Sequence, residues 1–290
     1  MYDIKSELIR NVMDKKIKEL EKKYDIIILM GCFTGSCTMN FHNSSSNFTF
    51  TFIFDSNQHN IEKFDLNEIL EINGKYDLRV TLYGRKKCNI LQGIEIQKQT
   101  DIKYPVYRTR NKAEIENRTS PPQYRKDFWF FVLLKMVTTD NLWIKNSSDA
   151  HKLFDTLRNE LYIIDILDFY FTRAQGNYDT YLTKEQKIPL RKYLYTLHEV
   201  MYMNWIIEKK VVPPMDFYEL SRQTIKKDAV ELEMSHLYKM NKESSMVKKK
   251  LFVSRNDILN NYIKENLLYI ESIFRDYPLK EQLKIKHEAF

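Results

Sequence analysis

Glycine, proline and cysteine are scarce in this sequence of 290 residues, which contains 6, 7 and 3 of them, respectively. So few turn-forming residues disfavour a β sandwich with many turns and favour long helices. The cysteines at positions 32, 37 and 88 form an odd number without the spacing of a disulfide framework, which suits a reducing cytoplasm. Cys32, Cys37 and His42 lack a fourth ligand, so we predict no zinc site there.

Long apolar runs are also absent from the sequence. The longest, residues 128–134, is too short to span a bilayer, and the charged N-terminal segment has no apolar signal region. We therefore predict no membrane partner and a cytoplasmic location, either in a bacterium or, if a phage encodes the protein, in its host. The sequence shows no Walker-type glycine loop and no Ser-His-Asp grouping, which leaves P-loop and triad chemistry without support.

The composition is that of a globular protein with a modest positive charge. Hydrophobic residues make up 43% of the chain and charged residues 29%, so disorder is not favoured. The net charge of +7 is compatible with a partner that bears phosphate, such as a nucleotide or a nucleic acid. The basic residues fall in short runs, such as 15–16, 209–210 and 248–250, and solvated helix faces explain most runs of this kind.

The N-terminal third of the chain changes between helical and strand periodicity. Apolar residues recur every three to four positions over 4–23, which predicts a helix. Residues 26–30 form a continuous apolar run rich in isoleucine, and 48–54 alternate phenylalanine with threonine, so both segments predict strands. A third short strand is predicted at 68–72, and the pattern from 77 to about 97 predicts a second helix.

The remainder of the chain has mainly helical periodicity. Residues 98–123 are polar and contain two adjacent prolines, which predicts a connector. Helical patterns follow at 124–138, 148–175, 190–209, 216–240 and 256–274. We therefore predict an α+β fold with an α/β domain at 1–100, a connector at 101–123 and a helical domain at 124–290.

A Gly-Ser turn between two predicted strands is the most distinctive local pattern. Gly35-Ser36 follows the strand at 26–30, and a loop rich in serine and asparagine leads to the strand at 48–54. Glycine at such a turn lets the backbone approach a triphosphate closely, and serine adds a hydroxyl. Without the flanking strands, the serine run at 44–46 would favour a flexible loop.

These residues resemble the catalytic stretch of the RNA-ligase-associated, polymerase-beta-like nucleotidyltransferases, the RlaP family. Gly35-Ser36 and Ser46 match the family's Gly-Ser turn and the serine of its Ser-Asp-x-Asp motif, and Asp77-Leu78-Arg79 resembles a later Asp-Leu-Arg segment. The similarity continues in the helical half, at Arg173-Ala174, Asn177-Tyr178, Tyr181-Leu182, 191–195, Trp205-Ile206 and 213–217. It implies a minimal nucleotidyltransferase fold, a mixed sheet with helices, packed against an all-helical C-terminal domain with a nucleotide-sized cleft between them.

The positions that hold metal ligands in this family are changed here. Asn47 and Thr49 stand where the family has two aspartates. Mg²⁺ prefers charged oxygen ligands, for which an amide and a hydroxyl are poor replacements. The resemblance therefore implies a catalytically degenerate member, a pseudoenzyme, with no metal site and no cofactor, except for Mg²⁺ if some activity survives. The family's second glycine is also replaced, by Asn40.

Two other carboxylates remain as candidate catalytic residues. Glu71 falls near the family's further carboxylate when one residue is inserted, and Asp77 begins the Asp-Leu-Arg segment. Asp55 lies six residues beyond Thr49, roughly 20 Å along an extended strand, which places it far from the changed positions.

The same resemblance predicts a set of nucleotide-binding residues: Gly35, Ser36, Ser46, Arg173, Arg191, Lys192 and Tyr195. Lys192 is expected to reach the triphosphate, with a solvated helix lysine as the alternative. Tyr178, Tyr193 and Tyr195 are suited to stacking on a base. Tyrosines at helical spacing more often fill the core with the hydroxyl at its edge, which is the alternative.

Three functions remain open at this point. The leading hypothesis is a degenerate RlaP-like protein that binds a nucleoside triphosphate or an RNA end. The second is an active nucleotidyltransferase with an altered metal site that uses Glu71, Asp55 or Asp77. The third is a phage or bacterial protein-interaction module that reuses the fold to bind a protein partner.

Overall fold

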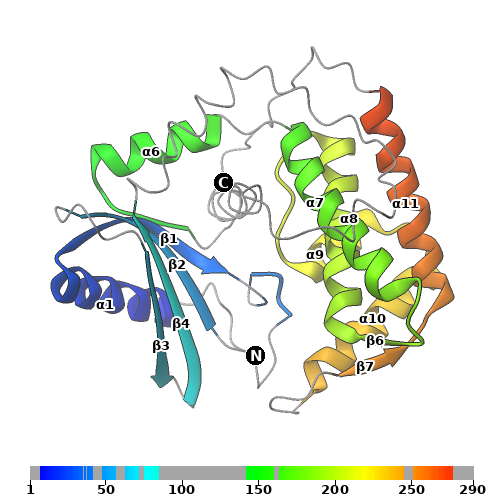
Figure 1. Cartoon of the computed structure of the whole chain (residues 1–290), viewed down its shortest axis with the longest axis horizontal. Coiled ribbons are helices and arrows are strands. Elements are labelled where there is room, and N and C mark those ends of the chain that lie inside the picture. The colour runs from blue at the N-terminus through cyan, green and yellow to red at the C-terminus, as the bar shows by residue number, and fades with distance from the viewer. Residues whose placement is uncertain are drawn as a thin grey trace, which may run out of the picture.

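The computed structural model combines a five-stranded mixed sheet with a group of packed helices (Figure 1). It describes residues 7–34, 36, 38–41, 48–56, 63–71, 75–84, 142–159, 163–244 and 251–276. The helical segments are α1 (Glu7–Tyr24), α6 (Ser148–Asn159), α7 (Ile163–Asn177), the π-helical turn η2 (Tyr178–Leu182), α8 (Leu190–Lys209), α9 (Phe217–Thr224), α10 (Asp228–Glu243) and α11 (Asp257–Asp276). The strands are β1 (Ile26–Thr34), β2 (Phe48–Ser56), β3 (Lys63–Glu71), β4 (Lys75–Gly84), β5 (Leu142–Ile144), β6 (Lys187–Pro189) and β7 (Phe252–Ser254).

The large sheet has the strand order β3-β4-β2-β1-β5. Antiparallel pairs join β1 to β2, β1 to β5 and β3 to β4, whereas β2 and β4 run parallel. The predicted α+β class, a mixed sheet with helices and a helical C-terminal part, is confirmed. The domain division at 101–123 stays a prediction, and any boundary has to accommodate β5, which joins the sheet from residues 142–144.

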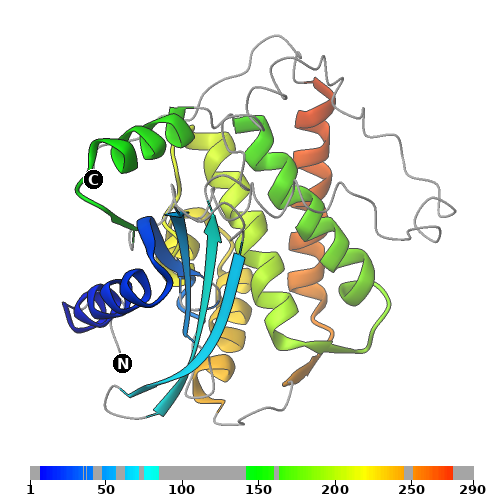
Figure 2. The ribbon, with the colours of Figure 1, turned by 60° about the vertical axis from the view of Figure 1, so that its left-hand side comes forward.

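The two faces of β2 differ in chemistry, as its alternation of phenylalanine and threonine predicts. Phe50, Phe52 and Phe54 are fully buried and share one face of the strand. Ile53 points to the other face and belongs to the large apolar core that continues into the helices. The sheet lies between α1 on one side and the helical part on the other (Figure 2). The phenylalanine face therefore packs on the α1 side, where Met13, Ile17 and Leu20 are also buried.

Helix α8 is the centre of the helical part. It contacts α7, α9, α10 and α11, and most of its 20 residues are buried. Its bounds match the predicted helix at 190–209. The helix ends where Lys210 adopts a left-handed conformation, ahead of the Pro213-Pro214 pair. Among the described residues, no helix combines the length and the apolar character needed to cross a bilayer.

Several predicted elements differ from the structure. The helix predicted from residue 77 is wrong, because β4 runs from Lys75 to Gly84 between β2 and β3. Apolar and polar residues alternate over 76–82, which is the period of a strand. The third strand begins at Lys63, five residues before its predicted start. The helices predicted at 148–175 and 216–240 are each two helices, α6 with α7 and α9 with α10. Residues 85–141, with the predicted connector and the helix at 124–138, lie outside the described residues.

Buried tyrosines make the fold sensitive to alkali. Burial raises the pKa of Tyr262 to about 12, and it also raises the pKa of Tyr170 and Tyr193. Since a tyrosine in the unfolded chain ionises near pH 10, the stability from the neutral hydroxyl of Tyr262 is complete below pH 10 and is lost as the pH rises to about 12.

We expect a smaller alkaline loss of stability in Tyr262→Phe than in the wild-type protein. Between pH 9 and 11 the difference should be about 1 kcal/mol, measured as the change in the free energy of urea unfolding. An equal loss in both proteins would show that Tyr262 ionises near pH 10 in the folded state.

Candidate functional site

The loop that follows β1 carries the Gly-Ser motif. Gly35 and Ser46 lie outside the described residues, whereas Ser36 is half-buried and its carbonyl accepts a hydrogen bond from the Phe41 amide at 2.7 Å. Between them Asn40 has a φ of 57°, in the left-handed region. Glycine, asparagine and aspartate adopt this region most easily, which explains why asparagine is accepted at the position that matches the family's second glycine.

This motif loop, residues 36 and 38–41, is anchored on the helical part through three consecutive carbonyls. The Met39 carbonyl accepts from the Phe217 amide at 3.2 Å, and the Phe41 carbonyl accepts from Asn241 Nδ2 at 2.8 Å. Between them the Asn40 carbonyl accepts from Tyr238 Oη at 3.2 Å. All three donors come from α9 and α10, so the loop that starts at β1 ends against the helices.

The side chain of Phe41 extends this contact to α8. Its ring is fully buried, lies edge-on to Tyr195 with centroids 5.5 Å apart, and is 4.9 Å from the ring of Phe217. Tyr195, one of the predicted nucleotide-binding residues, is half-buried at this junction. The structure therefore brings the motif loop against Tyr195 of α8.

Lys192 lies one turn before Tyr195 and has a fixed position. Its ammonium donates to Asn177 Oδ1 at 3.0 Å and lies over the Tyr181 ring, 4.8 Å from its centroid. Both partners flank or belong to η2, a single π-helical turn, and such turns are rare and recur at functional sites. The Asn177-Tyr178 and Tyr181-Leu182 segments, which resemble the family pattern, thus form the support for this lysine.

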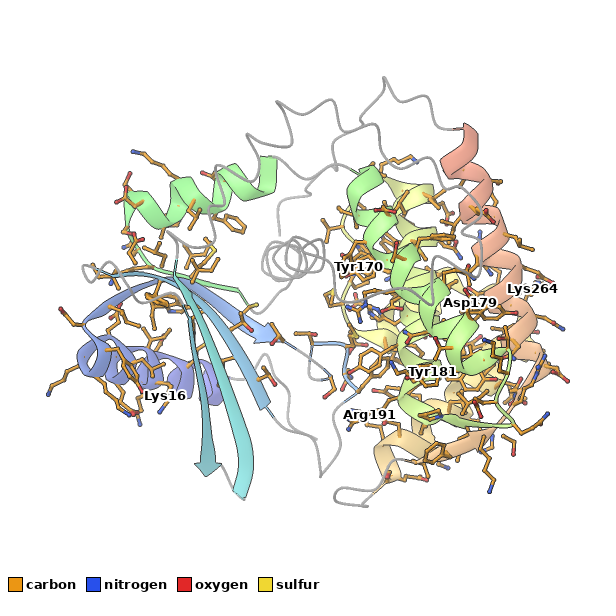
Figure 3. All side chains as sticks on the ribbon, viewed as in Figure 1. Lys16, Tyr170, Asp179, Tyr181, Arg191 and Lys264 are labelled. Carbon is orange, nitrogen blue, oxygen red and sulfur yellow. The ribbon has the colours of Figure 1, made fainter. Side chains whose placement is uncertain are left out.

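Arg173 and Arg191 have different surroundings. Arg173 Nε lies 3.0 Å from Glu199 Oε1, and its guanidinium lies over the ring of Phe169 at 5.4 Å. The Glu199 side chain is 1% exposed, while that of Arg173 is 34% exposed. The guanidinium of Arg173 therefore compensates the negative charge of a buried carboxylate. Arg191 is exposed and lies on the side of the helical part that faces the sheet, opposite to Lys264 (Figure 3).

The three tyrosines considered for base stacking are not equivalent. Tyr193 is fully buried and donates to Asn260 Oδ1, so it is a core residue. Tyr178 and Tyr195 are half-buried and lie nearer to the surface. Stacking on a base stays a prediction for these two.

Thr49, which matches one of the family's two aspartate positions, carries a hydroxyl and lies near the start of β2. Thr49 pairs with Thr34 of β1 and with Arg79 of β4, and Thr34 Oγ1 lies 3.1 Å from Thr51 Oγ1. In the described part of the chain, no three histidine, cysteine, aspartate or glutamate residues come together in a metal-binding group. Asn47 lies outside the described residues.

The backbone places the candidate carboxylates at different distances from Thr49. Asp77 precedes Leu78, the partner of Phe48, so it sits on the strand next to the start of β2. Glu71 lies at the end of β3, the edge strand, two strand spacings or about 10 Å from β2. Asp55 is near the other end of the unbroken strand β2, which leaves it remote from Thr49.

The sequence patterns did not single out Glu199 as a buried ion-pair residue or Asp216 as the cap of α9. Glu199 is a carboxylate among the buried positions of α8, and no local pattern reveals that its partner is Arg173. Asp216 had a readable signal, because an aspartate with a glutamate three residues later is typical of a helix start. Its Oδ1 accepts from the Glu219 amide at 2.9 Å and caps α9.

Comparisons with known proteins place this chain in a family. The family model for RlaP, described as the RNA repair pathway DNA polymerase beta family, matches residues 132–287, which hold α6 to α11. The uncharacterized protein YcgL of Bacillus subtilis (strain 168) is 21% identical over 262 residues, which cover 87% of this chain and 83% of that protein.

A solved structure is also similar to the chain. It is the crystal structure of a nucleotidyltransferase-like protein from Exiguobacterium sibiricum 255-15, with 11% identity over 91% of this chain and 74% of the other. Its TM-score of 0.29 is too low to bear on the arrangement described above. The family model, by contrast, matches more than half of the residues. The chain therefore belongs to RlaP, the RNA repair pathway DNA polymerase beta family.

Proposed function

We propose that this protein is a degenerate member of its family, which binds a nucleoside triphosphate or an RNA end and does not transfer nucleotide. Asn47 and Thr49 at the two metal-aspartate positions support the loss of transfer, because they bring no charge to hold Mg²⁺. The threonine contacts between β1 and β2 support it as well, since hydroxyls line this part of the strand pair.

The position of Lys192 carries the proposal for binding. Its ammonium is held by the Asn177 amide oxygen and the Tyr181 ring, and no carboxylate of the described residues lies within ion-pair distance of it. A positive charge that is fixed in place but not neutralised is suited to a phosphate. Tyr195, one turn along α8, contacts Phe41 of the motif loop, so Lys192 lies within one helical turn of the residue that meets this loop.

We expect nucleoside triphosphates to stabilise the protein and Lys192→Ala to remove about half of this effect or more. At a ligand concentration of 100 times Kd, the wild-type melting temperature should rise by about 5 °C, which corresponds to about 2.7 kcal/mol. The substitution should weaken binding by about tenfold to a hundredfold, because one charge-assisted hydrogen bond is lost. Thermal-shift titration with each triphosphate, and with a short RNA, measures both effects.

Lys209→Ala is the matched control. Lys209 lies on the same helix, about 25 Å away along its axis, and also stacks over an aromatic ring, with 3.8 Å from its ammonium to the Trp205 centroid. It should leave the ligand-induced shift unchanged. If no nucleotide and no RNA shifts the wild-type protein, the binding proposal fails and a protein-interaction module becomes the better hypothesis.

The parallel pairing of β4 with β2 favours a second candidate, an active enzyme with an altered metal site. It places Asp77 on the strand beside the start of β2, whereas Glu71 and Asp55 are farther away. Incubation with labelled triphosphates, RNA, and Mg²⁺ or Mn²⁺ distinguishes the two candidates. We expect no incorporation; incorporation that Asp77→Asn or Glu71→Ala abolishes would establish the second candidate.

A further inference from the structure

We propose that Asn40 is a positioning residue, which together with Asp216 and Lys242 forms a clasp that fixes the motif loop on the helical part. Asn40 Nδ2 donates to Asp216 Oδ2 at 2.8 Å, and Asn40 Oδ1 accepts from Lys242 Nζ at 2.8 Å. One amide thus bridges a carboxylate and an ammonium that lie 26 residues apart in the sequence, the first at the N-cap of α9 and the second in α10.

Asparagine suits this position for two reasons. Its amide donates and accepts at once, so it satisfies both charged partners, and each bond is strengthened by the charge. Its backbone also tolerates the left-handed region, where Asn40 has a φ of 57°. Glycine would fit the backbone without the bridge, and aspartate would place two carboxylates side by side.

The partners of the clasp are themselves held in place. Asp216 uses its other oxygen to cap α9, and Lys242 lies over the ring of Tyr238, whose hydroxyl donates to the Asn40 carbonyl. The side chain and the carbonyl of Asn40 are therefore both bonded to α9 and α10 or to their caps. Because the Phe41 amide donates to the Ser36 carbonyl, the clasp also sets the position of Ser36.

An exchange of the two acid and amide groups tests the clasp. In Asn40→Asp two carboxylates face each other, and in Asp216→Asn two amide NH₂ groups do. Each change alone therefore breaks the hydrogen bond between positions 40 and 216. The double variant restores this bond, because the new amide at 216 donates to the new carboxylate at 40. The carboxylate still accepts from Lys242, and the amide oxygen at 216 can still cap α9.

Hydrogen exchange followed by mass spectrometry measures how firmly the clasp holds the motif loop. In each single variant, the peptide that contains residues 38–41 should exchange about tenfold faster or more, because a charge-assisted hydrogen bond is lost. The double variant should return to within about threefold of the wild-type rate. A peptide from α11 should exchange at the same rate in all four proteins, which separates local loosening from general destabilisation.

Two outcomes would overturn the proposal. In the first, the single variants leave the exchange rate of residues 38–41 unchanged. In the second, the increase in this rate in the double variant equals the product of the increases in the two single variants. A consequence for the binding site rests on the proposed function. If triphosphates stabilise the wild-type protein, each single variant should lower the shift and the double variant should restore it. Failure of nucleotide binding appears as no shift in the wild-type protein, whereas failure of the clasp appears in the exchange rates.

Discussion

Replacing Arg173 with methionine should lower the free energy of unfolding by about 2–4 kcal/mol. The substitution leaves the buried carboxylate of Glu199 without the guanidinium that lies 3.0 Å from it. Breaking a fully buried pair in this way costs roughly 3–5 kcal/mol, and the value expected here is lower because a third of the Arg173 side chain is exposed. Urea unfolding at pH 7 measures the change.

Arg222→Met is the control for this experiment. Arg222 also lies over an aromatic ring, 5.8 Å from the centroid of Tyr218, and no carboxylate of the described residues forms an ion pair with it. Its replacement should change stability by less than about 0.5 kcal/mol. Adding Glu199→Gln to Arg173→Met should recover part of the loss, because the buried charge is gone. Equal losses in Arg173→Met and Arg222→Met would mean that the ion pair does not stabilise the fold.

Gly31→Ala should destabilise the protein by about 1–3 kcal/mol. A Cβ atom at position 31 would lie 2.1 Å from Cδ1 of Phe52, its register partner on β2. The ring of Phe52 is fully buried between other side chains and cannot turn away cheaply, so either the ring or the strand pair must shift. The melting temperature should fall by several degrees.

Gly176→Ala provides the opposite result within the same chain. Gly176 is an exposed residue of α7, and nothing lies within 4 Å of the position its Cβ would take. Alanine is favoured over glycine in a helix by about 0.5–1 kcal/mol, so this variant should be unchanged or more stable. A similar effect of both substitutions would show that Phe52 has room to move.

Local periodicity predicted much of the fold. The helix at 190–209 matches α8, and the Phe-Thr alternation identified both faces of β2, because a strand or helix that packs against one core repeats its apolar residues at the spacing of its backbone. The helix predicted from residue 77 failed because the alternation in β4 was missed. Residues 76–82 alternate apolar and polar side chains from Tyr76 to Leu82, which is the two-residue period of a strand.

The candidate site was predictable only in part. The resemblance predicts Lys192 and Tyr195 as binding residues, which stays a prediction, and the structure places Tyr195 against Phe41 of the motif loop. The contacts around them were not predictable, since Asn177 lies 15 residues from Lys192 along the chain, and Asn40 is separated from Lys242 by 202. Contacts of this range depend on how the helices pack, and a single sequence does not contain that information in a readable form.

The pairing of β5 with β1 affects how the protein is made. β1 lies between β2 and β5, and the Lys145 amide donates to the Leu29 carbonyl beside this pair. During translation, residues 142–145 leave the ribosome more than 100 residues after β1 does. Until then β1 is an edge strand whose backbone N–H and C=O groups are unpaired on one side, and such strands can pair with strands of other chains. A nascent chain that stalls before residue 142 is thus expected to need a chaperone.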